Sequence, residues 1–192
     1  MYAELLIDHA WGKESCTIAD IKNYKRKSRS ISHSQILPRN YNYKDAHIVM
    51  REMIQNGCYE LFRYGYVTRL VHIYIGYGDD KSGIKGMVRM KELTNLYSII
   101  VQYVDKLFEQ IVDKNKPIRK IGFDFGDLIS SENEQYDFFT DIERVKKEKK
   151  LVKGVLALQD KYGKNVILKG IDLEENATQI DRNKMIGGHN SE

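Results

Sequence analysis

The sequence has few of the residues on which disulfide-bonded and membrane-spanning proteins depend. Its 192 residues include two cysteines, Cys16 and Cys58, which are far apart and form no C-x-x-C pair. We therefore expect reduced thiols. No apolar run approaches the roughly 20 residues of a membrane span, and Glu4 and Asp8 interrupt the N-terminal stretch where a signal peptide is apolar. These absences favour a cytoplasmic protein with no membrane partner.

Motifs for metal or nucleotide chemistry are also scarce. The histidines are scattered, with no His or Cys pair at ligand spacing: His9, His33, His47, His72 and His189. No glycine-rich loop joins a strand to a helix, as phosphate-binding loops do, and Gly187-Gly188-His189 precedes no predicted helix. We therefore predict no catalytic residue, no metal site and no cofactor in this chain.

The stretch Gly76 to Gly83 reads GYGDDKSG and contains YGDD, the spelling of a metal-binding hairpin in template-copying RNA polymerases. Paired carboxylates hold two metal ions only when another strand brings a further aspartate alongside. The aspartates before this stretch fit no such strand: Asp8, Asp20 and Asp45. We interpret Asp79 and Asp80 as turn residues of a hairpin that holds no metal.

Positive charge is concentrated near the N-terminus. The net charge is +4 and the pI is near 8.8, whereas the segment from Lys22 to Arg39 carries six cations and no acid. Two interpretations stay open for this segment. It is a solvated linker, or it follows the phosphate backbone of a nucleic acid, where binding releases counterions.

Hydrophobic periodicity predicts a β-α-β-β-α-β block between residues 29 and 125. The expected strands cover 29–37 (closed by Pro38), 69–77, 84–91 and 118–125, and the helices cover 43–64 (capped by Asn42 and stopped by Gly65) and about 96–113 (capped by Thr94 or Asn95). This order predicts an α+β fold, in which two helices cover one face of a four-stranded, mostly antiparallel sheet. A charged C-terminal helix, about 142–162, and a polar tail follow.

Nothing in the sequence is available to cover the second face of this sheet. With the aliphatic residues turned inward, that face presents a polar, basic and partly aromatic set: His72, Tyr74, Lys85, Arg89, Lys91 and Lys120. Such a face suits a nucleic-acid backbone. The orientation of the first strand stays open, because its alternating Ser and Ile residues fit either face.

Two adjacent phenylalanines stand in the segment QYDFFTD, Gln135 to Asp141. Aromatic side chains after an acidic loop are not expected to be exposed without a reason. Either they fold back on their own domain beside the following helix, or they form a short linear motif that enters a pocket on a partner.

The chain resembles the C-terminal part of Y-family translesion DNA polymerases, in the branch of Gram-positive bacteria and their mobile elements. HAWGKESCTIADIKNYKRKSRSIS resembles the end of the thumb and the tether, the block ending in PIRKIGFDF resembles the little finger, and YGKNVILKGIDLEENATQIDRNKMIGGH resembles the tail of that branch. The resemblance implies this division: a thumb remnant at 1–16, a basic tether at 17–28, the little-finger domain at 29–130, a motif loop at 131–141, and a helix with a tail at 142–192.

The resemblance also implies which residues bind partners. QYDFF resembles the sliding-clamp motif Gln-Leu-Ser/Asp-Leu-Phe: Gln135, Asp137 and Phe139 match it, whereas Tyr136 and Phe138 stand in place of leucines. Primer-template duplex DNA is expected to contact the sheet face and the tether through Lys25, Lys27, Arg29, His72, Lys85, Arg89, Lys91 and Lys120.

The catalytic acids of the family, which bind Mg²⁺ in the palm, do not occur in this sequence. The resemblance therefore implies a DNA-binding and clamp-docking region that does not polymerise nucleotides without the palm, fingers and thumb of the enzyme, as an excised piece or a truncated product. The alternative is a stand-alone interaction module that binds the sliding clamp or competes for it.

Overall fold

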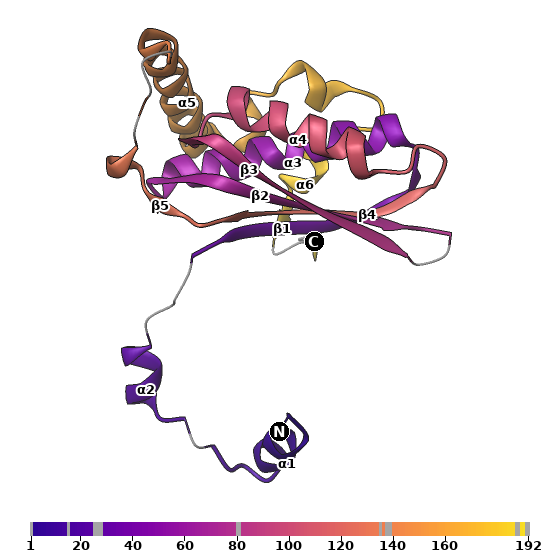
Figure 1. Ribbon diagram of the computed structural model, residues 1–192, viewed down its shortest axis with the longest axis vertical. Helices are drawn as coiled ribbons and strands as arrows, with labels where there is room; N and C mark the ends of the chain where they lie inside the picture. The colour runs from indigo at the N-terminus through magenta and orange to yellow at the C-terminus, as the bar shows by residue number, and fades with distance from the viewer. Residues whose placement is uncertain are drawn as a thin grey trace.

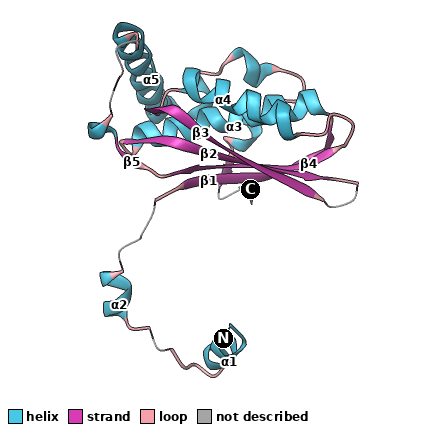
Figure 2. Cartoon of the chain, in the orientation of Figure 1, coloured by secondary structure: helices cyan, strands magenta, loops and turns pink. Residues whose placement is uncertain are grey.

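The computed structural model describes residues 2–14, 16–24, 29–79, 82–134, 136, 140–186 and 189–190. Figure 1 shows a sheet with helices α3 and α4 on one side of it, and Figure 2 shows the same view by secondary structure. Two helices, α1 at Tyr2–Ala10 and α2 at Ile18–Asn23, lie apart from the sheet (Figure 1). Helix α2 lies within the predicted tether, where the Thr17 side chain and Asp20 cap each other's backbone N–H groups.

The sheet confirms the predicted α+β fold. Its main strands are β1 Ile31–Tyr41, β2 Tyr66–Tyr77, β3 Gly83–Thr94 and β4 Ile118–Gly126. They lie in the order β1-β4-β2-β3, and each neighbouring pair is antiparallel. A short strand that the sequence did not predict, β5 Ile129–Ser130, pairs with the start of β2.

Helices α3 Tyr43–Arg63 and α4 Tyr97–Ile111 pack against the sheet and form the core with it. Val71, Ile73 and Ile75 alternate along β2 and are buried on this side. Each fully buried aliphatic side chain of this size stabilises the fold by roughly 1.5–3 kcal/mol. The two helices leave the opposite side of β2, with His72 and Tyr74, half-buried.

The helix signals in the sequence were mostly correct. Asn42 caps α3 by accepting a hydrogen bond from the N–H of Asp45, and Gly65 follows the helix at φ +67°. The cap predicted for α4 was wrong, because Leu96 occupies the N-cap position and makes no side-chain cap bond. Thr94 instead accepts a hydrogen bond from the Leu96 N–H at 3.0 Å.

The first strand does not end at Pro38, as the sequence had suggested. Strand β1 continues to Tyr41 and its pairing with β4 shifts between Ile36 and Tyr41. Because β1 is an edge strand, and the ladder is irregular there, a residue without an N–H is tolerated at this place.

The C-terminal region contains the predicted charged helix, α5 Ile142–Tyr162, capped by Asp141. The other elements after β5 are short: η1 Ser131–Asn133, η2 Lys164–Val166, η3 Gly170–Leu173, α6 Gln179–Arg182, β6 Met185–Ile186 and β7 His189–Asn190. The tail packs against α3, where Glu52 accepts hydrogen bonds from the N–H groups of Thr178 and Gln179 at 2.9 and 3.1 Å. Gly187 and Gly188 lie outside the described residues.

Both cysteines are free thiols, Cys16 exposed and Cys58 buried. Burial raises the pKa of the Cys58 thiol. Within the described ranges, no helix is both long enough and apolar enough to cross a membrane.

Candidate nucleic-acid interface

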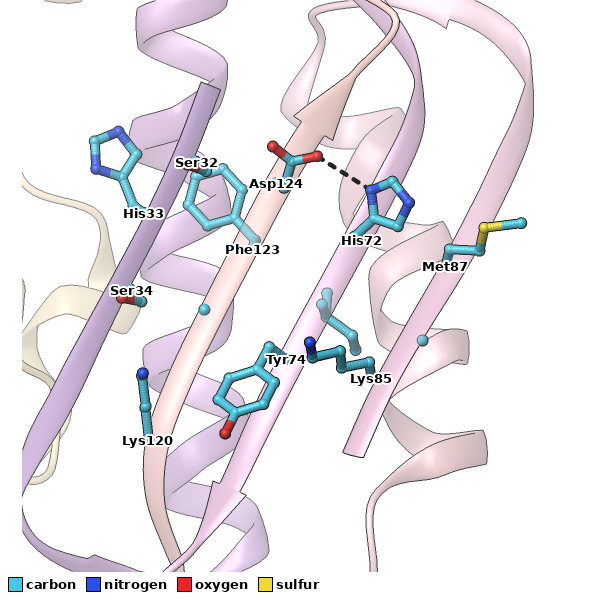
Figure 3. A pocket seen from close by; sticks show the side chains of 13 residues that line it. Ser32, His33, Ser34, His72, Tyr74, Lys85, Met87, Lys120, Phe123 and Asp124 are labelled. Carbon is cyan, nitrogen blue, oxygen red and sulfur yellow. Dashed lines mark hydrogen bonds and ion pairs between the residues drawn. The ribbon is translucent and has the colours of Figure 1, made fainter. Parts of the chain in front are cut away.

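Strand register brings side chains from all four main strands together on the face opposite α3 and α4. Residues directly across from each other in an antiparallel ladder point to the same side of the sheet. The register therefore gives three neighbouring rows on this open face: Ser32, Asp124, His72 and Met87; Ser34, Gly122, Tyr74 and Lys85; Ile36, Lys120, Gly76 and Gly83. Figure 3 shows side chains of these rows lining one pocket.

Tyr74 lies between two lysines at the centre of the open face. The ammonium of Lys120 is 5.3 Å from the centroid of the Tyr74 ring, and that of Lys85 is 5.7 Å from it. Lys85 comes from β3 and Lys120 from β4, and Figure 3 shows the ring between them. A cation over an aromatic ring is attracted by about 0.5–1 kcal/mol at an exposed site. The ring thus helps to keep two positive charges on one side of the sheet.

Asp124 and Asp127 on this face each have a side-chain partner. His72 Nδ1 lies 3.1 Å from Asp124 Oδ2, the pair joined by the dashed line in Figure 3. Arg89 Nη2 lies 2.9 Å from Asp127 Oδ2. Lys85 and Lys120, by contrast, contact the Tyr74 ring and form no ion pair with a carboxylate among the described residues. The positive charge that is available to a ligand is therefore concentrated around Tyr74.

A shallow depression of about 880 Å³ follows the rows across the sheet. Its floor on β1 and β4 is built of small residues, Ser32, Ser34 and Gly122, whereas the two lysines stand at one end of it. Small residues allow a bulky ligand to approach the sheet closely. Exposed Met87 on β3 and Ile36 on β1 add apolar area on the two edge strands of the sheet. The depression suits an elongated anion better than a small enclosed ligand.

The structure brings some of the predicted DNA-contacting residues together and separates others. His72, Lys85 and Lys120 line the depression, and Arg89 lies on the same face. Lys91 is exposed two residues beyond Arg89. Arg29 precedes β1, and its guanidinium reaches the start of β2, where it lies 5.4 Å from the centroid of the Tyr66 ring and is bonded to the Tyr66 hydroxyl. Lys25 and Lys27 lie outside the described residues.

Ser32 and Ser34 could not be placed on this face from the sequence, whereas Asp124 follows from the same alternation as Lys120. The orientation of the first strand was open, and only its register against β4 decides it. That register turns His33 to the helix side, where its Nε2 lies 2.8 Å from Glu60 Oε2. The alternation of Ser and Ile was the only local signal, and it fits both orientations.

The predicted clamp motif is described at one of its five positions. Tyr136 is described, and its hydroxyl accepts a hydrogen bond from Lys149 Nζ at 3.0 Å, whereas Gln135, Asp137, Phe138 and Phe139 lie outside the described residues. Lys149 also binds the carboxylate of Glu134, whose side chain is 4% exposed. Although burial lowers it, the pKa of Lys149 is raised overall by its bonds to Glu134 and Tyr136. Tyr136 is thereby attached to α5.

The YGDD stretch forms the connection between β2 and β3, as the sequence predicted. The N–H of Tyr77 donates to the carbonyl of Ser82 at 2.9 Å, and the N–H of Gly78 donates to the carbonyl of Pro117 at 2.9 Å. Asp80 lies outside the described residues. Within the described part, no three His, Cys, Asp or Glu side chains lie close enough together to hold a metal ion.

Comparison with known proteins gives one family match. Residues 28–138 match the impB/mucB/samB family C-terminal domain. No curated protein matches the chain.

Solved structures with a similar fold include polymerases and one isolated domain. A Y-family DNA polymerase chimera has 17% identity and a TM-score of 0.44, covering 67% of this chain and 36% of that one. DinB from Sulfolobus solfataricus has 17% identity and a TM-score of 0.39 over the same shares. The little finger domain of PolIV, in a complex with the beta-clamp processivity factor, has 7% identity and a TM-score of 0.40, covering 58% of this chain and 100% of that one. The chain thus spans about a third of the length of the polymerases that it matches.

Proposed function

Because the chain belongs to the impB/mucB/samB family of C-terminal domains, we propose that it is the DNA-binding and clamp-docking region of an error-prone translesion DNA polymerase. The family match bears out the resemblance over residues 28–138, whereas the thumb remnant, the tether and the tail stay predictions. Assignment to the branch of Gram-positive bacteria stays a prediction. The remainder of such a polymerase, with its palm, fingers and thumb, would be a further partner.

The observation that carries DNA binding is the pair of lysines around Tyr74 on the open face. Lys85 and Lys120 reach that face from two different strands and would contact phosphates of a primer-template duplex. Phosphate contacts position a protein on DNA without reading its sequence. The small residues of the floor allow the duplex backbone to come close. Binding of this kind tolerates any sequence, which suits a polymerase acting at damaged sites.

We predict that replacing Lys85 and Lys120 together by glutamine weakens duplex binding by roughly tenfold at physiological salt. Each lost phosphate contact also reduces the slope of log affinity against log salt by about 1. Fluorescence anisotropy with a labelled primer-template duplex over a series of salt concentrations measures both effects. The matched control is Lys106→Gln, an exposed lysine on α4, on the helix side of the sheet. Equal affinities for the two variants would contradict this interface.

Clamp docking is proposed for the segment from Gln135 to Phe139. Its sequence resembles the clamp motif, and the described Tyr136 is 42% exposed although its hydroxyl is bonded to Lys149. A partly exposed aromatic side chain is a suitable anchor for an apolar pocket on a partner.

We expect Phe138→Ala combined with Phe139→Ala to abolish capture of the chain by an immobilised bacterial sliding clamp. Truncating anchors of a motif removes most of its binding free energy, while the sheet face is unchanged. Duplex affinity measured on the same protein is the internal control. Clamp capture that survives the double substitution would exclude this motif. The alternative is a module that binds only the clamp. It would be favoured if the unchanged protein binds the clamp but not the duplex, and the double substitution abolishes clamp capture.

No catalytic residue is proposed in this chain. The palm acids that hold Mg²⁺ in the family do not occur in its sequence, and no metal-binding cluster is present among the described residues. We therefore propose that the chain binds a primer-template without extending it.

A further inference from the structure

A second cavity lies on the helix side of the molecule, where the C-terminal tail meets α3 and α5. Its volume is about 310 Å³, and it is lined by side chains of α3, α5, η2 and α6. Asn56, Gln159, Lys164 and Arg182 are among the polar residues that line it. Sequence segments that are far apart meet here, so the cavity exists only when the tail is in place.

Arg182 of α6 is the unusual group in this cavity. Its Nη1 atom is buried and has no hydrogen-bond partner among the described residues. A buried charged donor without a partner is strongly unfavourable, because the atom has lost its hydration without replacement. Burial accordingly lowers the pKa of Arg182, although the charges of Glu52 and Glu60 oppose this shift. An atom of this kind requires a partner that the described residues do not supply.

The acids around Arg182 are already engaged with other groups. Glu60 Oε2 lies 2.8 Å from His33 Nε2. Both carboxylate oxygens of Glu52 accept hydrogen bonds from the backbone of the tail, from Thr178 and Gln179. Asn56 donates to Gln179 Oε1 at 2.5 Å. Among the described residues, the Arg182 Nη1 donors are therefore left without a hydrogen-bond acceptor.

We propose that this cavity is a binding site for a phosphate group, which Arg182 would hold with its planar guanidinium. The two parallel N–H donors of arginine match the oxygen atoms of phosphate. Lys164 lines the same cavity and supplies a second cation. The cavity is about ten times the ~30 Å³ share of one liquid water molecule, so it has room for inorganic phosphate or the phosphate group of a mononucleotide. Bound phosphate would link α6 to α3 and so secure the tail.

Thermal unfolding with increasing phosphate tests this site, with chloride at equal ionic strength as the reference. A ligand that binds only the folded chain raises its melting temperature in a saturable way. We expect this rise for the unchanged chain and for Lys153→Gln, an exposed lysine of α5, and at least a tenfold weaker phosphate affinity for Arg182→Gln. Lys164→Gln should weaken the phosphate affinity several-fold. Because Lys164 is exposed and Arg182 is retained in this variant, the loss cannot be attributed to a folding defect.

One further variant and one further ligand distinguish this cavity from the open face and identify its ligand. The variant with Lys85 and Lys120 replaced by glutamine removes phosphate bound at the open face, so the saturable rise that it keeps reports on the cavity alone. Adenosine monophosphate that binds more tightly than inorganic phosphate would identify a nucleotide as the ligand, and equal affinities would identify phosphate itself. No rise beyond that in chloride, or an unchanged response of Arg182→Gln, would overturn the proposal and leave water as the occupant. Neither result depends on whether the open face binds DNA.

Discussion

At the scale of single residues, Asp105 shows how one carboxylate joins two helices. It lies on α4, and it accepts hydrogen bonds from Arg51 Nε and Nη2 of α3 at 2.9 and 2.6 Å, while His47 Nε2 lies 2.7 Å from it. Burial alone would raise its pKa, yet the bonds from His47 and Arg51 hold the pKa of Asp105 at about 2. The carboxylate is therefore stabilised in its ionised form by the folded state.

This shift predicts a loss of stability in acid. A carboxyl whose pKa is about 2 in the folded chain, against an ordinary value of 3.8, contributes roughly 2 kcal/mol above pH 3.8. That contribution declines as the pH falls from about 4 toward 2. Asp105→Asn should lower the free energy of unfolding at pH 7 and weaken its dependence on pH between 4 and 2. Urea unfolding at several pH values measures both, and parallel pH curves for the variant and the unchanged chain would contradict the assignment.

Residues of the open face differ in how far the sequence could predict them. His72, Tyr74 and Lys85 follow from alternation within two strands, because Val71, Ile73 and Ile75 mark the buried side. Ser32 and Ser34 do not follow, since their face depends on the register of β1 against β4, a strand that is distant in the chain. A period of two cannot choose between the faces of a strand whose residues are small and mixed.

At the scale of elements, local chemistry decided the ends of the helices. Asn42 starts the helix and Gly65 ends it through contacts and backbone angles that involve only nearby residues, so both ends of α3 could be located from the sequence. Pro38 was misleading because its effect depends on whether the strand lies at an edge, which is a property of the whole sheet. Likewise, β5 is too short to leave a pattern and forms only because β2 extends past β3 and β4 to meet it.

Gly65 provides a test of this local control. It adopts φ +67°, and a Cβ added there would meet only Ser131 Oγ, at 3.8 Å. Gly65→Ala should therefore lower the free energy of unfolding by about 1 kcal/mol through the backbone alone. Gly154, inside α5 with nothing within 4 Å of an added Cβ, is the matched control: Gly154→Ala should stabilise α5 by roughly 0.5–1 kcal/mol. Chemical denaturation measures both, and a shift of the same sign for the two variants would contradict this account.

At the scale of the whole molecule, the tail is the feature that sequence patterns could not place. It has little apolar periodicity, and its attachment uses polar groups whose partners lie on α3, far away in the chain. Lys169 reaches Gln55 and lies 3.8 Å from the centre of the Tyr97 ring. Each of these contacts involves a side chain that would be equally common on a solvated surface, so no local signal distinguishes them.

Glu52 is the contact on which the attachment of the tail depends most. Its side chain is almost fully buried, at 1% exposure, and both of its oxygens bind the tail backbone. Glu52→Ala would leave the N–H groups of Thr178 and Gln179 without acceptors, and hydrogen bonds to a charged group contribute about 1.5–3 kcal/mol. We expect amide hydrogen exchange to accelerate in residues 164–186 while the sheet strands keep their protection. Asp181→Ala, on the exposed side of α6, is the control and should change neither the exchange rates of residues 164–186 nor the protection of the sheet strands. Faster exchange throughout the sheet would show that the tail supports the whole fold, whereas unchanged exchange in the tail would show that other contacts hold it.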